Sequence, residues 1–249
     1  MKKHIFYTLM GCLAVLTLAG AVNGFAEAVP VEKDIDIVWT KSDGIRPEIF
    51  YTSKVVGGWS EPVMVTDDYY DNMHPVIDRD SGDTRWLFWT AYDNNRTEIR
   101  YATGSAGEWE NSQALADELT SNSGPSVVID KNDAVWVVWS ASDGGPDDIY
   151  YAVNRDGEWS DPRIFHEPND VPDTLPVVSL TDEGMVSVSW KQVQGDKYVL
   201  VTSDYDGADW SLPVASEIAD EDDKDDSEAD RIVLPEFINP NGRVFIRVY

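Results

Sequence analysis

The sequence predicts an all-β protein built from repeated four-stranded antiparallel units, and a periodic spacing of tryptophan is the first reason. Two series of tryptophans recur at steps of 50 or 51 residues, namely Trp39, Trp89, Trp139 and Trp190, and Trp59, Trp109, Trp159 and Trp210. A fixed period of a few tens of residues is typical of an array of similar supersecondary units. The period therefore predicts the fold class before any local pattern is considered.

The clearest copy of the repeat lies between residues 125 and 165. Short runs of β-branched and aromatic residues predict strands at 125–130, 134–140, 148–153 and 159–165. The segments between them are rich in Asn, Asp, Gly and Pro, as turns are. Because Val135 to Trp139 is apolar at every position, we expect this second strand to be buried on both faces, as it would be between two neighbouring sheets.

Four-stranded units of this length, repeated around an axis, predict a β-propeller. We expect a single domain over residues 27–249, with repeats at about 35–66, 74–116, 125–166, 176–217 and 231–249. The chain enters on a second strand, at 35–39, and its last repeat offers a first strand, 231–239, and a second, 243–249. This count favours five blades with incomplete terminal blades, and a four-bladed ring is the alternative.

The third strands are rich in tyrosine, and each leads through a glycine turn to the tryptophan that opens the fourth strand. In the last complete copy this segment reads Ser203-Asp-Tyr-Asp-Gly207-Ala-Asp-Trp210. Over residues 34–249 the chain resembles the neuraminidase-repeat, or Asp-box, propellers of the sialidase superfamily, with degenerate Asp-boxes. The resemblance implies a propeller whose ligand lies on the face formed by the hairpins between strands two and three and the crossovers between blades.

Residues 1–26 have the pattern of a secretory signal peptide. Lys2 and Lys3 precede an apolar run from Ile5 to Val22, and small residues predict cleavage after Ala26. We therefore expect a secreted or periplasmic protein with no membrane segment in its mature form. Lipidation at Cys12, within Leu9-Met10-Gly11-Cys12, is the alternative, although the residues after Cys12 stay apolar.

Charge and cysteine content exclude several classes of function for the mature chain. Loss of Lys2 and Lys3 takes the formal net charge from −27 to −29, so the surface repels nucleic acid. Cys12 is the single cysteine, so cleavage leaves no disulfide, thiolate metal site or cysteine nucleophile. Carbohydrate or protein ligands remain, and the sequence does not specify an oligomeric state.

Polar residues recur at fixed offsets from the second-strand tryptophans and are the candidate ligand-binding residues. They come from the hairpins and from the crossovers, where an Asn or Asp precedes a proline by three residues, and they are Arg46, Glu48, Asn72, His74, Arg96, Glu98, Asn122, Asp148 and Asp173. Together they would form a ring of carboxylates and guanidinium groups around a polar ligand. The alternative is that they cap turns and pair with one another at the surface.

The resemblance also bears on catalysis, because a sialidase of this fold uses an arginine trio, a tyrosine activated by a glutamate, and an acid/base aspartate. Only Arg46 and Arg96 recur on the expected face. We therefore predict no catalytic residues and expect an exported recognition propeller for a carbohydrate or cell-surface ligand. A sialidase-like glycoside hydrolase and a protein-interaction scaffold are the alternatives.

The last repeat is lengthened by an acidic loop at 219–230. Eight of the eleven residues from Asp220 to Asp230 are acidic, yet the run lacks the glycine and the ligand spacing of an EF-hand loop. We expect a solvated loop and no cofactor, with calcium at Asp220, Asp222 and Asp226 as the alternative.

Overall fold

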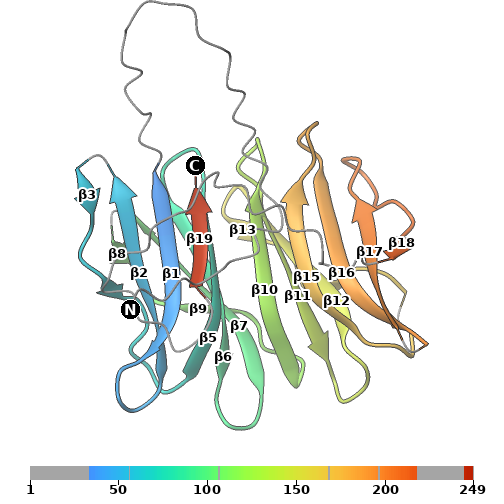
Figure 1. The fold of residues 1–249 in the computed structure, drawn as a ribbon, viewed down its shortest axis with the longest axis horizontal. Helices are drawn as coiled ribbons and strands as arrows, with labels where there is room; N and C mark the ends of the chain where they lie inside the picture. Colours follow the sequence, from blue (N-terminus) through green and yellow to red (C-terminus); the bar gives the residue numbers. More distant parts are fainter. Residues whose placement is uncertain are drawn as a thin grey trace, which may run out of the picture. The chain divides into compact units, whose positions relative to one another are not determined.

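The structure is a computed structural model, and it describes residues 34–55, 57–105, 107–167, 169–195, 197–217 and 244–248 of the 249-residue chain. In these ranges the strands form four antiparallel sheets, and no helix there is long and apolar enough to cross a membrane. The predicted all-β class is confirmed, and the fold is a β-propeller of four-stranded units (Figure 1).

The first two sheets have the same strand order. The first contains β19 (Val244–Val248), β1 (Ile35–Ser42), β2 (Pro47–Val55), β3 (Gly58–Trp59) and β4 (Val63–Met64). The second contains β5 (Asp71–Arg79), β6 (Arg85–Tyr92), β7 (Thr97–Ser105), β8 (Glu108–Trp109) and β9 (Gln113–Ala116).

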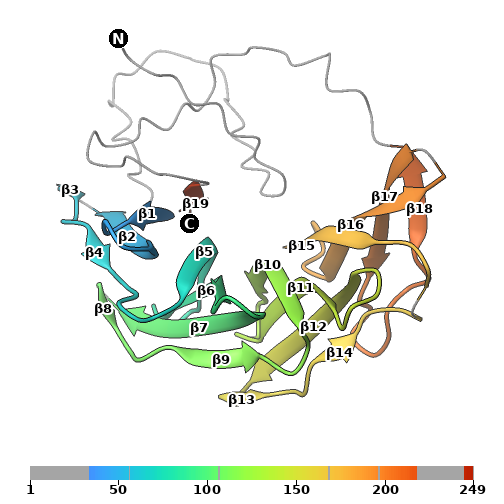
Figure 2. The same cartoon turned by 90° about the horizontal axis from the view of Figure 1, so that it is seen from below.

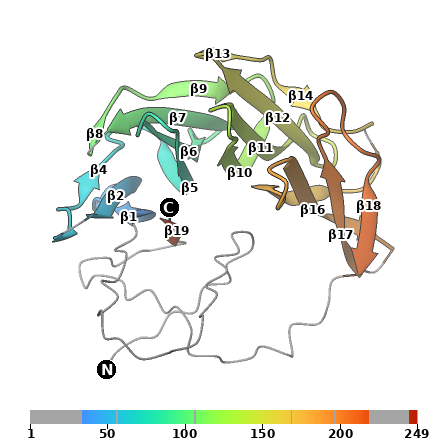
Figure 3. The same ribbon diagram turned by 90° about the horizontal axis from the view of Figure 1, so that it is seen from above.

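The third and fourth sheets repeat this order. The third contains β10 (Ser121–Ile129), β11 (Val135–Ser142), β12 (Asp148–Arg155), β13 (Glu158–Trp159) and β14 (Arg163–Ile164). The fourth contains β15 (Asp173–Leu180), β16 (Val186–Gln194), β17 (Lys197–Asp204) and β18 (Val214–Glu217). Figures 2 and 3 show β5, β10, β15 and β19 on the inner side of the sheets and β9, β14 and β18 on the outer side.

The fourth strand of a unit is broken where the sequence predicted one continuous strand. In the third sheet, β13 pairs with the end of β12 and β14 pairs with its start, and Ser160-Asp161-Pro162 separates them. Pro162 has no N–H to donate to the ladder. Ser160 makes up part of this loss, because its Oγ accepts a hydrogen bond from Val153 N at 3.1 Å.

The first strands begin earlier than the sequence predicted, and a bulge interrupts each of them. The proline expected to open the strand lies inside it, at a register shift such as that between Met73 and Val76. The residue before each proline has a positive φ: 55° at His74, 63° at Gly124 and 54° at Leu175. The bulge carries Asn72, which was predicted to lie in a crossover, into strand β5.

The hydrophobic core lies between successive sheets, as the apolar second strands predicted. Trp39, Trp89, Trp139 and Trp190 are each at most 1% exposed. In β11 the residues from Val135 to Ala141 are all buried, so the prediction that this strand is buried on both faces is confirmed. Burial of the large rings at every sheet boundary supplies most of the driving force for folding.

Two buried ion pairs join sheets that lie far apart in sequence. Arg85 Nε donates to Asp36 Oδ2 at 2.9 Å and so links β6 to β1. Arg247 Nη2 donates to Asp78 Oδ2 at 2.6 Å and links β19 to β5, and Asp78 Oδ2 also accepts a hydrogen bond from Ile129 N of the third sheet. Burial raises the pKa of Asp78, and the charge of Arg247 opposes that rise.

Strand β19 takes a position that the sequence did not predict for residues 243–249. It pairs antiparallel with β1, from Ile35 with Val248 to Trp39 with Val244, and so forms the inner strand of the first sheet rather than a second strand of another unit. The predicted first strand 231–239, the acidic loop 219–230 with Asp220, Asp222 and Asp226, and the signal peptide 1–26 with Cys12 lie outside the described residues.

Candidate functional site

The hairpins between second and third strands share a face with the crossovers between sheets, as predicted. Backbone hydrogen bonds join the two kinds of segment: Thr97 N donates to Thr120 O, and Asp173 N donates to Asp147 O. We call this side of the described residues the hairpin face. The turns between third and fourth strands lie on the opposite side, which we call the turn face.

The candidate binding residues differ widely in exposure. Five are buried, namely Glu48, Asn72, Glu98, Asn122 and Asp173. The other four are exposed or half-buried, namely Arg46, His74, Arg96 and Asp148. The predicted ring of carboxylates therefore lies largely beneath the surface, and His74 is exposed at its bulge.

The Asn or Asp near the start of each of the first strands β5, β10 and β15 accepts a hydrogen bond from the tryptophan of the adjacent second strand. Trp89 Nε1 donates to Asn72 Oδ1 at 2.7 Å, and Trp139 Nε1 donates to Asn122 Oδ1 at 3.1 Å. Trp190 Nε1 donates in the same way to Asp173 Oδ1 at 2.9 Å. A buried indole N–H requires an acceptor, which explains why an Asn or Asp recurs at this position.

The hairpin aspartates act as turn caps. Asp43 Oδ1 accepts hydrogen bonds from the backbone N–H groups of Ile45 and Arg46, at 2.6 and 2.9 Å. These bonds lower the pKa of Asp43. Asp93 caps the next hairpin through Asn95 N and Arg96 N. Their recurrence is thus explained by local turn chemistry.

Three equivalent clusters, which we call junctions, form where the start of a third strand meets the following crossover. The acid of each junction comes from the third strand, and these acids are Glu48, Glu98 and Asp148. They occupy equivalent positions, because they pair with residues 41, 91 and 141 of the second strands. In the first junction, Thr66 Oγ1 and Asn72 Nδ2 both donate to Glu48 Oε2, the latter at 3.0 Å. Burial raises the pKa of Glu48, and these two donors oppose the rise.

The second junction is closed by two arginines. Arg96 Nη2 lies 3.0 Å from Glu98 Oε1, and Arg100 Nη1 lies 3.1 Å from Glu98 Oε2. The Arg100 guanidinium also covers the Tyr70 ring, 4.9 Å from its centroid. Burial raises the pKa of Tyr70, and the hydrogen bond from Tyr69 raises it further. This tyrosine is therefore held as a neutral phenol.

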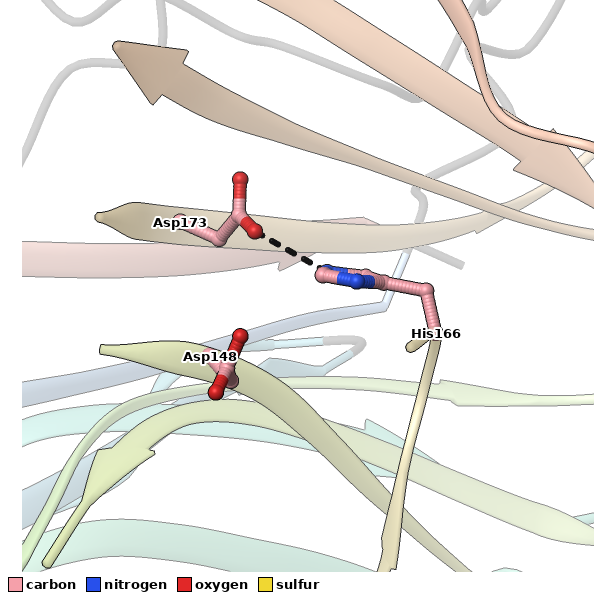
Figure 4. Close-up of side chains that lie close together, drawn as sticks. All are labelled: Asp148, His166 and Asp173. Carbon is pink, nitrogen blue, oxygen red and sulfur yellow. Dashed lines mark ion pairs between the residues drawn. The ribbon is translucent and has the colours of Figure 1, made fainter. Parts of the chain in front are cut away.

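The third junction brings together Asp148, His166 and Asp173 (Figure 4). The side chain of Asp173 is fully buried, and that of His166 is 12% exposed. His166 Nε2 lies 3.0 Å from Asp173 Oδ2, and one ligating atom from each residue lies within 4.8 Å of the other two. The His166 ring stacks on Trp190, with 5.5 Å between centroids.

The charges of the third junction are strongly coupled. The contact with Asp173 raises the pKa of His166. Burial raises the pKa of Asp148. Burial also acts to raise the pKa of Asp173, but the contacts with His166, Asn169 and Gln192 outweigh it and the net shift is downward. Two carboxylates, one of them fully buried, are thus placed near one imidazole.

Sequence reasoning selected Asp148 and Asp173 but missed His166. The repeat contained the necessary signal, because Val65 N donates to Ile49 O and Phe165 N donates to Ile149 O, which makes Thr66 and His166 equivalent. Each follows its fourth-strand tryptophan by seven residues. Alignment of the fourth strands would have placed His166 beside the acid of the third junction.

The turn face carries an open groove between the third and fourth sheets. Its two adjoining parts have volumes of about 230 and 510 Å³ and share Trp136, Arg155 and Tyr205. The Arg155 guanidinium lies over the Trp136 ring, 5.0 Å from the centroid. Tyr205 pairs with Trp210 at the position that Lys54, Gly104 and Asn154 hold in the other sheets. The further lining includes Tyr151, Asp209 and Trp210.

These features define a β-propeller with polar junctions on one face and an aromatic groove on the other. No protein-family model and no curated protein matches the chain. Among solved structures, it is similar to a Hadza microbial sialidase, with 13% identity, a TM-score of 0.50, and coverage of 66% of this chain and 44% of that one.

Two further solved structures show the same fold. A triple arginine-to-alanine mutant of AofleA from Arthrobotrys oligospora matches with 14% identity, a TM-score of 0.53, and coverage of 75% of this chain and 54% of that one. A polysaccharide lyase of a new family, an ulvan lyase, matches with 10% identity, a TM-score of 0.52, and coverage of 68% and 49%. The chain spans about half the length of these structures. At such identities the likeness shows the fold.

Proposed function

We propose that this protein is an exported, non-catalytic recognition propeller that binds carbohydrate in the groove between its third and fourth sheets. The groove carries the proposal because it combines aromatic rings with a guanidinium and a carboxylate, supplied by Tyr205, Trp210, Arg155 and Asp209. A sugar ring presents apolar C–H groups on its faces and hydroxyl groups at its edges. Aromatic faces suit the former, and charged hydrogen-bonding groups suit the latter.

Tyr205 supports this location because it distinguishes the fourth repeat from the others. Its ring lies 4.9 Å from that of Trp136 and 5.1 Å from that of Trp210, which extends the aromatic cluster of the core toward the surface. The equivalent residues Lys54, Gly104 and Asn154 cannot supply a stacking surface. The proposed ligand therefore binds at this one boundary among the described sheets.

The first and second junctions of the hairpin face, whose acids are closed by donors, support a non-catalytic role. A glycosidase needs a carboxylate that is free to transfer a proton and a second that is free to attack or to activate water. Both oxygens of Glu98 are bound by arginines, and Asp173 has hydrogen bonds or close contacts at both of its oxygens. Tyr70, with its raised pKa, is poorly suited to act as a nucleophile.

The names of the similar structures agree with a carbohydrate ligand, since they include a sialidase and an ulvan lyase. Because the likeness concerns the fold, these names suggest only the class of ligand. The proposed location of the site rests on the groove between the third and fourth sheets. A sialidase-like hydrolase and a protein-interaction scaffold are the competing functions.

A glycan array tests the proposal when it is combined with turnover assays on fluorogenic glycosides, including a sialoside. We expect the wild-type protein to bind glycans without turnover, and Arg155→Ala and Tyr205→Ala each to weaken binding at least tenfold. Arg46→Ala is the matched control, because it removes a guanidinium from the hairpin face and should leave binding unchanged.

Each other outcome refutes a defined part of the proposal. Turnover of any glycoside would refute the non-catalytic role. Failure of the wild-type protein to bind any glycan would refute the carbohydrate ligand and favour a protein-interaction scaffold. Loss of binding in Arg46→Ala, with normal binding in Arg155→Ala, would move the site to the hairpin face.

A further inference from the structure

The three junctions share one architecture, but the third exchanges donors for acceptors. The first junction pairs Glu48 with the donors Thr66 Oγ1 and Asn72 Nδ2. In the third junction Asp148, His166 and Asp173 occupy the positions of Glu48, Thr66 and Asn72, in that order. A hydroxyl and an amide donor are lost, and a second carboxylate is gained. The contacts that close the first junction therefore cannot close the third.

The orientation of His166 is fixed by its other nitrogen. His166 Nδ1 lies 2.8 Å from the carbonyl oxygen of Glu167. A carbonyl oxygen only accepts hydrogen bonds, so Nδ1 carries the proton and donates it. In the neutral ring the lone pair is then on Nε2, which faces Asp173 Oδ2 at 3.0 Å. A lone pair and a carboxylate oxygen repel each other at this distance unless a positive charge lies between them.

Two buried polar atoms of the junction lack a hydrogen-bond partner. His166 Nε2 is close to Asp173 Oδ2 but makes no hydrogen bond of acceptable geometry, and Asp148 Oδ1 is buried with no hydrogen-bond partner among the residues that the structure describes. Buried polar atoms are rarely left unpaired, and such exceptions call for an explanation. Figure 4 shows both carboxylates near the edge of the His166 ring.

We propose that Asp148, His166 and Asp173 bind a divalent transition-metal cation, with Zn²⁺ as the model ion. One imidazole nitrogen and two carboxylate oxygens form a ligand set that suits Zn²⁺ and leaves a coordination position for water or another ligand. Ligands of a tetrahedral zinc site, at about 2.0 Å from the ion, lie about 3.3 Å apart. The 3.0 Å between Nε2 and Oδ2 is close to that spacing. The ligating atom of Asp148 lies within 4.8 Å of the other two and would have to move closer to complete the set.

The surroundings of the junction hold its ligands in place. Asp173 Oδ1 accepts hydrogen bonds from Trp190 Nε1 and Gln192 Nε2, each at 2.9 Å. Asp173 Oδ2 accepts a hydrogen bond from Asn169 Nδ2 at 2.9 Å and also faces His166. The contact of Nδ1 with a backbone carbonyl is the common arrangement behind a metal-binding imidazole. The site lies on the hairpin face, apart from the groove of the proposed function, so either proposal can fail without the other.

Zinc titration of the full mature chain tests this proposal. We expect isothermal calorimetry with ZnCl₂ to show one tight site, and Co²⁺ in its place to give the visible absorption bands of tetrahedral coordination. Asp148→Asn and His166→Gln should each weaken Zn²⁺ binding at least a hundredfold and abolish the Co²⁺ bands. Glu48→Gln is the matched control, because it changes the equivalent acid of the first junction and should leave both signals intact.

Circular dichroism of each variant, recorded without metal, shows whether the fold is retained, and Asp148→Asn is the milder change because that side chain is only half-buried. Zinc binding that is equally strong in both variants would overturn the proposal and assign the ion to other acidic residues. No zinc binding by the wild-type protein, with ¹⁵N spectra that show His166 protonated at both nitrogens at neutral pH, would also overturn it and identify a proton as the positive charge.

Discussion

Replacement of Asp36 by alanine should strongly destabilise the boundary between the first and second sheets. Its carboxylate accepts hydrogen bonds from Arg85 Nε at 2.9 Å and from Tyr51 Oη at 2.8 Å. The side chains of Asp36 and Arg85 are only 2% and 5% exposed, so water cannot replace the lost partner. The guanidinium would remain buried without its counter-charge.

Loss of one partner of a buried ion pair costs about 3–5 kcal/mol, because it leaves the other charge uncompensated. That is a large part of the roughly 5–15 kcal/mol that stabilises a typical domain. Urea unfolding followed by tryptophan fluorescence would measure the change. With a slope of about 2–3 kcal/mol per molar urea, we expect the midpoint to fall by roughly 1–2.5 M.

Three further variants separate the contributions to this loss. Tyr51→Phe removes one donor to a charged acceptor and should cost about 1.5–3 kcal/mol. Asp83→Asn is the control, because this acid also lies near Arg85 but is 59% exposed, and its loss should cost less than about 1 kcal/mol. In a double-mutant cycle, Asp36→Ala with Arg85→Ala should cost less than the sum of the single changes. A loss below about 1 kcal/mol for Asp36→Ala, or strict additivity, would refute the reasoning.

Three other predictions follow from the described geometry. Leu175 has a φ of 54° where the preceding repeat has Gly124, so Leu175→Gly should stabilise the protein by about 1 kcal/mol in urea unfolding, and a loss of stability would contradict this. Burial raises the pKa of Glu48 above 4.5, so the folded protein holds that proton more tightly and loses stability as the pH rises from about 4.5 through the pKa of the folded state. Glu48→Gln, which cannot ionise, should therefore gain stability relative to wild type over that rise, and parallel pH profiles would exclude the effect. Hydrogen bonds from Ser81 lower the pKa of Asp133, a stabilisation that is lost as the pH falls through that pKa, so Ser81→Ala should raise the pKa in an NMR titration, whereas an unchanged pKa would show that the hydroxyl is not involved.

The sequence predicted the sheets because their signals are local and repeated. Trp139 ends a run, from Val135, that is apolar at every position, and such a strand is stable only between two sheets. The bulges were harder to predict from the sequence, because a proline such as Pro125 is equally compatible with the start of a strand and with an interruption inside one. The register of pairing with the neighbouring strand decides whether the proline starts the strand or lies inside it, and the composition of the strand does not specify that register.

The junctions show why site residues are harder to predict than strands. The repeat identified Glu48, Glu98 and Asp148 as equivalent, but their chemical states depend on partners from other segments: Thr66, two arginines and His166, respectively. A ring of carboxylates and guanidinium groups around one ligand was expected, and the three acids instead lie in three different electrostatic environments. Only the fold brings together the groups that decide whether an acid is neutralised, paired or left open to a cation.

The pairing of β19 with β1 has a consequence for the order of folding. Strand β1 is the first and β19 the last of the described strands along the chain, yet they form adjacent strands of one sheet. Contacts between such distant segments are slow to form, because a long stretch of chain must be closed first. Until then the inner edge of β1 is an unpaired template. A β19 strand from a second molecule fits that edge as well as the chain's own, so high concentration during refolding should favour strand-exchanged dimers over monomers.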